Sequence, residues 1–159
     1  MSRPARRERT DVPIVVTKAV MALMRAADAA RREMVQALAP YEITLQQFNV
    51  LIILRHVGSE GLPTLEVAAR LVEQTPGITR LMNTLVAKRY IRRLRSKQDQ
   101  RQQLCSLTND GVQLIDKVLP QIRASQARVV RPIDQEDLDQ FIELLSKITP
   151  KQKLATGKD

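Results

Sequence analysis

Cysteine and histidine are nearly absent from this 159-residue chain, which has one of each. The single cysteine, Cys105, excludes a disulfide within the chain, and Cys105 with His56 cannot supply the four ligands of a structural zinc site. We also find no Gly-rich phosphate loop and no Ser/His/Asp combination. The sequence therefore predicts a protein without metal or cofactor that is not an enzyme and that stays reduced in the cytoplasm.

Long apolar runs and aromatic residues are also scarce. No run approaches the roughly 18–20 residues of a membrane helix, and Lys18 interrupts the early apolar stretch "VPIVVTKAV". Aromatic residues make up 3% of the chain and tryptophan is absent, so we expect a mainly aliphatic core. The hydrophobic content of 43% and charged content of 27% are typical of one globular domain away from a membrane.

Positive charge is abundant and concentrated, with a net charge of +9. Between Arg70 and Arg101 nine basic residues accompany two acidic ones, whereas the rest of the chain holds seventeen basic and fifteen acidic residues. A focused basic stretch indicates an anionic partner such as nucleic acid.

Hydrophobic spacing predicts a mainly helical chain. Apolar residues three, four and seven apart predict a long helix over 12–38, which Pro40 ends. Thr44 is a suitable cap for "LQQFNVLIILRHV", and Thr64 opens "TLEVAARLV", where we expect Leu65 to pack inward with Ala68, Ala69 and Val72.

A second helix follows this one after a very short connector. Thr75 as its cap and Pro76 at its first position predict that "PGITRLMNTLVAKRY" is helical, with Thr79, Arg80, Asn83 and Thr84 facing solvent. Two short helices with a tight link and a polar outer face are typical of a helix-turn-helix.

The pattern changes after Tyr90. "IRRLRS" and "QQLCSLT" predict a two-stranded hairpin around the protruding loop "KQDQR". Thr108 is then expected to cap a helix over 109–130 with a kink at Pro120, and Asp134 begins a last helix whose acidic first turn suits the helix dipole.

In this order the segments resemble the multiple antibiotic resistance regulator (MarR) family of winged-helix transcription factors. The matching stretches are "LQQFNVLIIL", "TLEVAARL", "TPGITRLMNTLVAKRYIRR" and "SKQDQRQQLCSLTNDG". The wing signature, Asp-x-Arg followed by Leu-Thr-x-x-Gly, stands here as Asp99, Arg101, Leu107, Thr108 and Gly111. The chain departs from the family at Gln100, where arginine is common, and at Pro76-Gly77, where hydroxyl residues are frequent.

The resemblance implies a mainly α fold with a small antiparallel hairpin, assembled as a homodimer. It also implies a small aromatic or anionic effector bound between the dimerisation helices and the winged domain, near His56. The expected organisation is a flexible basic arm at 1–11, a dimerisation helix at 12–40, a winged helix-turn-helix region at 41–108, dimerisation helices at 109–148 and a flexible tail at 149–159.

The resemblance places double-stranded DNA against the second helix and the wing. Arginine pairs with guanine and asparagine with adenine in the major groove, and Arg80 suits base or phosphate contact equally. By family analogy Arg101 enters the minor groove, held by Asp99. The predicted DNA-binding residues are Thr64, Gln74, Thr75, Gly77, Thr79, Arg80, Asn83, Lys88, Arg93, Arg95, Lys97, Asp99 and Arg101.

Two alternatives stay open at this point. Cys105 is either a small packed apolar residue or an accessible redox sensor. The chain as a whole is predicted to be a sequence-specific, ligand-responsive repressor of a pseudo-palindromic operator, and the alternative is a non-regulatory architectural or RNA-binding winged helix.

Overall fold

A computed structural model describes residues 13–71, 77–96, 99 and 101–149 of the chain. The fold is mainly α-helical with one small antiparallel sheet, which confirms the predicted fold class. The elements are α1 (Ile14–Leu38), a 3-10 turn (Ala39–Tyr41), α2 (Leu45–Val57), a second 3-10 turn (Gly58–Glu60), β1 (Leu62–Pro63), α3 (Thr64–Arg70), α4 (Ile78–Ala87), β2 (Ile91–Arg95), β3 (Gln103–Leu107), α5 (Asn109–Val130) and α6 (Gln135–Ile148).

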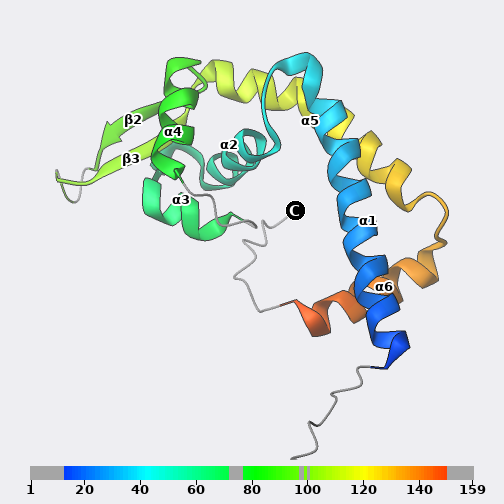
Figure 1. Ribbon diagram of the computed structural model, residues 1–159. Coiled ribbons are helices and arrows are strands. Elements are labelled where there is room, and N and C mark those ends of the chain that lie inside the picture. Colours follow the sequence, from blue (N-terminus) through cyan, green and yellow to red (C-terminus); the bar gives the residue numbers. More distant parts are fainter. Residues whose placement is uncertain (1–12, 72–76, 97–98, 100, 150–159) are drawn as a thin grey trace, which may run out of the picture.

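The elements form a winged region and a helical extension, which consists of α1, α5 and α6 (Figure 1). The winged region holds α2, α3, α4 and the sheet, and the β2–β3 hairpin projects from its edge. α5 runs from this region to lie beside α1, to which Arg128 is joined by an ion pair with Glu33 at 3.1 Å. No single described helix is long and apolar enough to cross a membrane; α1 and α2 reach that composition only together, across an 82° bend.

The hydrophobic core lies where α2 meets α3, α4, α5 and the sheet. Val50, Leu51 and Leu54 of α2 are completely inaccessible to solvent. Most of their neighbours in this core are aliphatic, as the shortage of aromatic residues predicted, and Phe48 is the aromatic residue among the buried ones. The core also includes Val67, Met82, Leu85, Ile91, Ile115 and Val118.

Three helix starts follow directly from capping residues, as predicted. The Thr44 hydroxyl accepts a hydrogen bond from the Gln47 backbone N–H, and the Gln47 side chain accepts one from the Thr44 N–H, both at 3.1 Å. Thr108 caps α5 and Asp134 caps α6 by accepting the backbone N–H of Gly111 and Asp137 respectively. These contacts span three residues, so local sequence is sufficient to specify them.

The buried face of α3 differs from the prediction. Thr64 is the first residue of the helix, as predicted, but Leu65 is 79% exposed. Val67 and Leu71, four residues apart, are the residues that α3 and its C-cap bury. A seven-residue helix presents only a narrow stripe to the core, and α2 and α4 select which stripe that is.

The predicted start of α4 is also wrong. α4 begins at Ile78, and Gly77 precedes it with a φ of +87°, a left-handed conformation that favours glycine. Thr75 and Pro76, the expected cap and first position, lie outside the described residues.

The sheet has three strands in the order β1–β3–β2, rather than the two strands predicted. β1 contributes only Leu62 and Pro63, with Leu62 opposite Cys105. At Gly61 a Cβ atom would lie 2.7 Å from the Cys105 carbonyl oxygen, so glycine permits the close approach of β1 to β3. A two-residue strand ending in proline carries too little pattern to be recognised from sequence.

Candidate nucleic-acid interface

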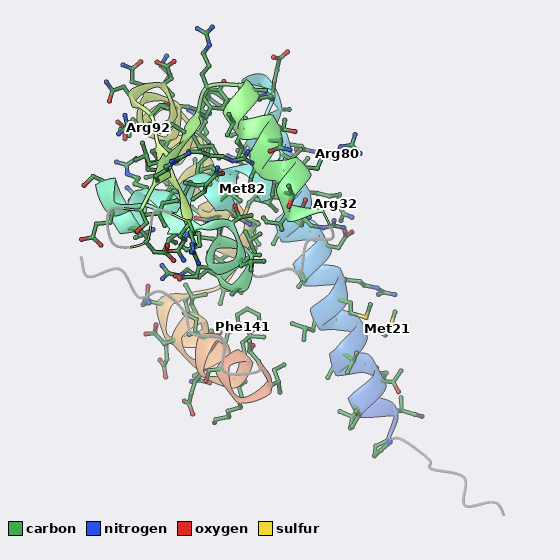
Figure 2. All side chains as sticks on the ribbon, turned by 90° about the vertical axis from the view of Figure 1, so that its left-hand side faces the viewer. Met21, Arg32, Arg80, Met82, Arg92 and Phe141 are labelled. Atoms are coloured by element: carbon green, nitrogen blue, oxygen red, sulfur yellow. The ribbon has the colours of Figure 1, made fainter. Side chains whose placement is uncertain are left out.

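The two faces of α4 differ sharply in burial. Met82 and Leu85 are completely buried, whereas Thr79, Arg80 and Asn83 are exposed, as predicted. Thr84, also predicted to face solvent, is half-buried, and its hydroxyl donates to the Arg80 carbonyl at 3.0 Å. Figure 2 shows Met82 within the winged region and Arg80 projecting outward from α4. The exposed face therefore carries hydrogen-bonding side chains on a helix held rigidly from behind.

A hydrogen bond joins this face to the hairpin. Ile91, Arg93 and Arg95 alternate along β2 and share a face, and Ile91 is 98% buried in the core behind α4. The Arg93 Nη2 donates to Asn83 Oδ1 at 2.5 Å. The sequence predicted both residues as DNA contacts but not their contact with each other.

The Thr-x-x-Gly part of the wing signature connects the end of α4 to the start of α5. The Thr108 hydroxyl donates to the Arg89 carbonyl at 2.6 Å and accepts from the Gly111 N–H at 3.1 Å. Arg89 has a φ of +61°, and a Cβ on Gly111 would lie 2.1 Å from the Tyr90 carbonyl oxygen. These contacts set the position of the hairpin relative to α4.

The tip of the wing is shaped by backbone hydrogen bonds around Asp99. The Asp99 carboxylate accepts from the Arg101 backbone N–H at 2.9 Å, and the Asp99 carbonyl accepts from the Gln102 N–H at 2.9 Å. Asp99 therefore orders the backbone at residue 101, while its predicted hold on the guanidinium stays a prediction. Lys97 and Gln100 lie outside the described residues.

Lys88 has a structural contact that the sequence did not indicate. Its Nζ donates to the Glu42 carbonyl at 2.5 Å and so ties the end of α4 to the loop before α2. Glu42 has a φ of +53°. Lys88 is exposed at the end of α4, and Arg95 is exposed at the end of β2.

Of the four predicted residues at or near the helix-turn-helix link, the two that the structure describes lie outside α4. Thr64 is half-buried, and its hydroxyl lies 3.8 Å from the Cys105 sulfur, which directs it towards the sheet. Gln74 and Thr75 lie outside the described residues, and Gly77 is exposed immediately before α4.

Basic residues also line a surface hollow at the base of the wing. This hollow of about 400 Å³ lies between the end of α4 and the start of α5. Arg92, labelled in Figure 2, donates from Nε to the Ser106 hydroxyl at 3.3 Å on the sheet face opposite Arg93. The residues that line this hollow are Arg89, Arg92, Leu107, Thr108, Asn109 and Asp110.

Cys105 and His56 have contrasting environments. Cys105 is 99% buried in β3, which supports the packed alternative rather than an accessible sensor. His56 is exposed near the end of α2, and its Nδ1 lies 2.8 Å from the Ile52 carbonyl oxygen. His56 lines neither the hollow at the wing nor a second hollow of about 380 Å³ along α1.

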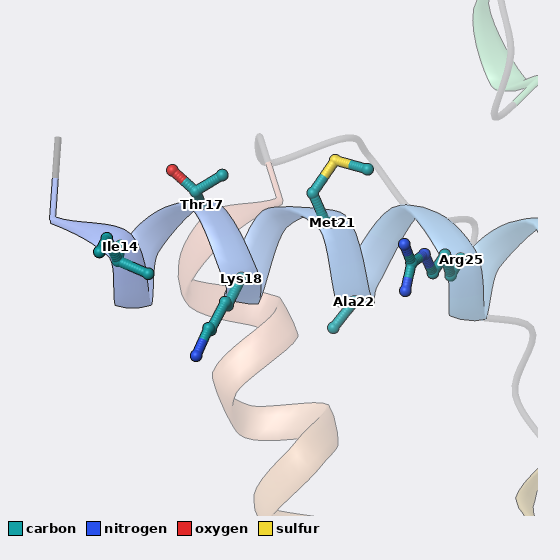
Figure 3. Close-up of a pocket in the computed structure, with 6 residues that line it drawn as sticks. All are labelled: Ile14, Thr17, Lys18, Met21, Ala22 and Arg25. Atoms are coloured by element: carbon teal, nitrogen blue, oxygen red, sulfur yellow. The ribbon is translucent and has the colours of Figure 1, made fainter.

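The second hollow is an open surface on one helix. Figure 3 shows its six lining residues along the first turns of α1, where apolar and basic side chains alternate. They are Ile14, Thr17, Lys18, Met21, Ala22 and Arg25. Because all six come from one helix, they do not enclose a ligand within a single chain.

Comparisons with known proteins identify the same class. A sequence profile described as the transcriptional regulator SarA/Rot matches residues 34–118. The HTH-type transcriptional regulator TtmR of Methylorubrum extorquens is 33% identical over 103 residues, which are 65% of this chain and 52% of that protein. The HTH-type transcriptional regulator YhbI of Bacillus subtilis is 28% identical over 120 residues, covering 76% of this chain and 75% of its own.

Solved structures share the fold. A mutant MarR from Escherichia coli, crystallised with operator DNA, superposes with a TM-score of 0.76 at 21% identity and covers 89% of this chain and 100% of its own. A MarR transcription factor from Planctomyces limnophilus superposes with a TM-score of 0.66 at 27% identity, covering 87% and 99% respectively. These relatives are regulators rather than enzymes, in agreement with the missing catalytic groups.

Proposed function

Because the chain belongs to the SarA/Rot family of transcriptional regulators and has the winged-helix fold of MarR proteins, we propose that it represses transcription by binding a pseudo-palindromic operator as a homodimer. The observation that carries this proposal is the exposed face of α4. There Thr79, Arg80 and Asn83 stand on a helix whose opposite side is anchored in the core.

The geometry of α4 and the wing fits a duplex. An α-helix with a polar outer face suits the major groove, which is about 12 Å wide, and the hairpin at its side reaches along the duplex. Arg80 and Asn83 contact base edges in this arrangement. Arg95 and Lys88 contact phosphates, and Arg101 at the wing tip enters an adjacent minor groove narrowed by A·T pairs.

Homodimerisation is supported by apolar side chains left exposed in the single chain. On α1, Ile14 is 75% and Met24 61% exposed, and on α6, Leu144 is 59% and Ile148 64% exposed. α6 buries none of its residues, and Figure 2 shows it standing apart from the first half of α1. Exposed apolar faces of this kind mark association surfaces, and a second copy supplies matching ones.

Two half-sites about one helical turn apart then fit the two winged domains of a dimer. A small aromatic or anionic effector that binds between the helical extension and the winged region changes the spacing of these domains. Such an effector lowers DNA affinity only by its preference for the non-binding spacing. We place this regulation in the cytoplasm, together with the DNA.

The test is selection of DNA sequences by the full-length protein from a random duplex library. We expect one pseudo-palindrome to be enriched and to bind at least about a thousandfold more tightly than random duplex at matched salt. Equal affinity for all duplexes would leave the architectural alternative, and preference for duplex RNA of the same sequence would leave the RNA-binding one. Transcription in vitro from a promoter overlapping the selected site tests the sign of regulation, since a repressor lowers the yield.

A further inference from the structure

Arg93 and Asn83 form a single recognition unit at the junction of the hairpin and α4. We propose that Arg93 determines which base Asn83 reads, so that the pair selects guanine at a position where an unconstrained asparagine selects adenine. This inference rests on the proposed function, because it concerns how the same surface discriminates between operators.

The position of Arg93 is set by the sheet. In β2 the side chains of Ile91 and Arg93 lie on the same face, and Ile91 is anchored in the core. Arg93 is therefore directed past the edge of the core to the exposed face of α4, where its guanidinium meets Asn83 at 2.5 Å. Both side chains are exposed, so the pair stands at the surface that the proposal assigns to DNA.

The chemistry of arginine fixes the orientation of the Asn83 amide. A guanidinium has five N–H donors and no acceptor, so only the oxygen of the amide can face it. The amide NH₂ group then points away from Arg93, with its N–H donors available. The unpaired guanidinium N–H groups lie beside it, and together they form a surface made mainly of donors.

The bases differ in how they meet such a surface. Adenine presents an acceptor at N7 and a donor at N6, so a bidentate asparagine needs both its oxygen and its nitrogen at the base edge. Guanine presents two acceptors, N7 and O6, whereas cytosine presents a donor and thymine one acceptor beside a methyl group. Among the four bases guanine alone offers two acceptors, so it complements the pair best.

The test starts from the selected duplex and replaces each base pair in turn by the other three. Fluorescence anisotropy at fixed salt gives the affinity of wild type, Arg93→Met and Arg93→Lys for every duplex. Wild type is expected to prefer guanine at one position of each half-site by about fivefold or more. Arg93→Met frees the amide oxygen, so adenine should equal or exceed guanine there, while Arg93→Lys keeps a donor at the oxygen and keeps the guanine preference.

A variant in which residue 83 accepts hydrogen bonds instead of donating them provides a second, independent measurement. Asn83→Asp replaces the outward NH₂ group by a carboxylate oxygen that only accepts, so the guanine preference at the same position should be lost in favour of a base with an amino donor, cytosine through N4 or adenine through N6. Circular dichroism spectra of all variants establish that they fold, as expected for exposed positions.

Arg95→Met is the matched control, because Arg95 shares the strand and the face of Arg93. Its loss should weaken binding by a similar factor on every duplex, without moving any base preference. The inference is overturned if Arg93→Met behaves like Arg95→Met, or if its base preferences equal those of wild type at every position. If no duplex is enriched at all, the proposed function fails rather than this inference.

Discussion

Replacing Gly111 by alanine tests whether the wing is held in place by a close backbone contact. Gly111 lies in the first turn of α5, where the Thr108 hydroxyl accepts its N–H. On helix propensity alone, alanine would stabilise this turn by about 1 kcal/mol. The structure predicts the opposite sign.

The magnitude follows from the space at this residue. A Cβ on Gly111 would lie 2.1 Å from the Tyr90 carbonyl oxygen and 3.2 Å from a methyl carbon of Leu107. The first contact is with backbone, so α5 or the turn at Tyr90 between α4 and β2 must shift by about 1 Å to bring this distance to 3.0 Å. Overpacking of this kind costs typically ~1–3 kcal/mol. We take the upper end because backbone must move, and subtracting the propensity gain leaves about 2 kcal/mol of destabilisation.

The assay is urea unfolding followed by circular dichroism at one fixed protein concentration, because dimerisation makes stability concentration-dependent. Gly111→Ala should lower the unfolding midpoint temperature by roughly 4–8 °C in a parallel thermal scan. Gln113→Ala, at an exposed site of the same helix, serves as the control and should stay within about 0.5 kcal/mol of wild type. A Gly111→Ala protein as stable as wild type, or more stable, would refute the reasoning.

Three further predictions concern DNA, assembly and capping. Arg101→Ala should weaken operator binding strongly because the minor groove loses a positive charge, and unchanged affinity would reject its groove role. Ile142→Glu, at a 58% exposed position of α6, should yield monomers in sedimentation velocity while the fold persists; unaltered dimers would exclude α6 from the interface. Thr44→Ala removes one cap of α2 and should cost about 1 kcal/mol in urea unfolding, and an unchanged midpoint would contradict the capping box.

The parts of this fold that were predictable from sequence depend on contacts between near neighbours. The caps at Thr44, Thr108 and Asp134 each span three residues, and the buried side of α4 follows from the helical repeat that places Met82 and Leu85 together. The concentrated positive charge and the wing signature also predict the class of partner, which is nucleic acid. Local hydrogen bonds and helical periodicity depend only on which residue types stand a few positions apart in the chain.

Other parts of the candidate site depend on residues far apart in the chain. The sequence around Val67 does not indicate that this residue is more buried than Leu65. Packing of α3 against neighbouring helices decides which of the two side chains is buried. Likewise, β1 exists because Gly61 allows Leu62 to approach β3. These pairings require the backbone of distant segments to be in place first.

The sequence alone therefore determined the class of the protein: a mainly helical, basic, winged-helix regulator with its polar side chains on one helix and one hairpin. Only the tertiary structure decided how those side chains combine. It brought Arg93 of β2 to Asn83 of α4 and set Thr108 and Gly111 against the end of that helix. The physical reason is that helix and strand patterns state which way a side chain faces, whereas the partner it meets there is fixed by how the elements pack.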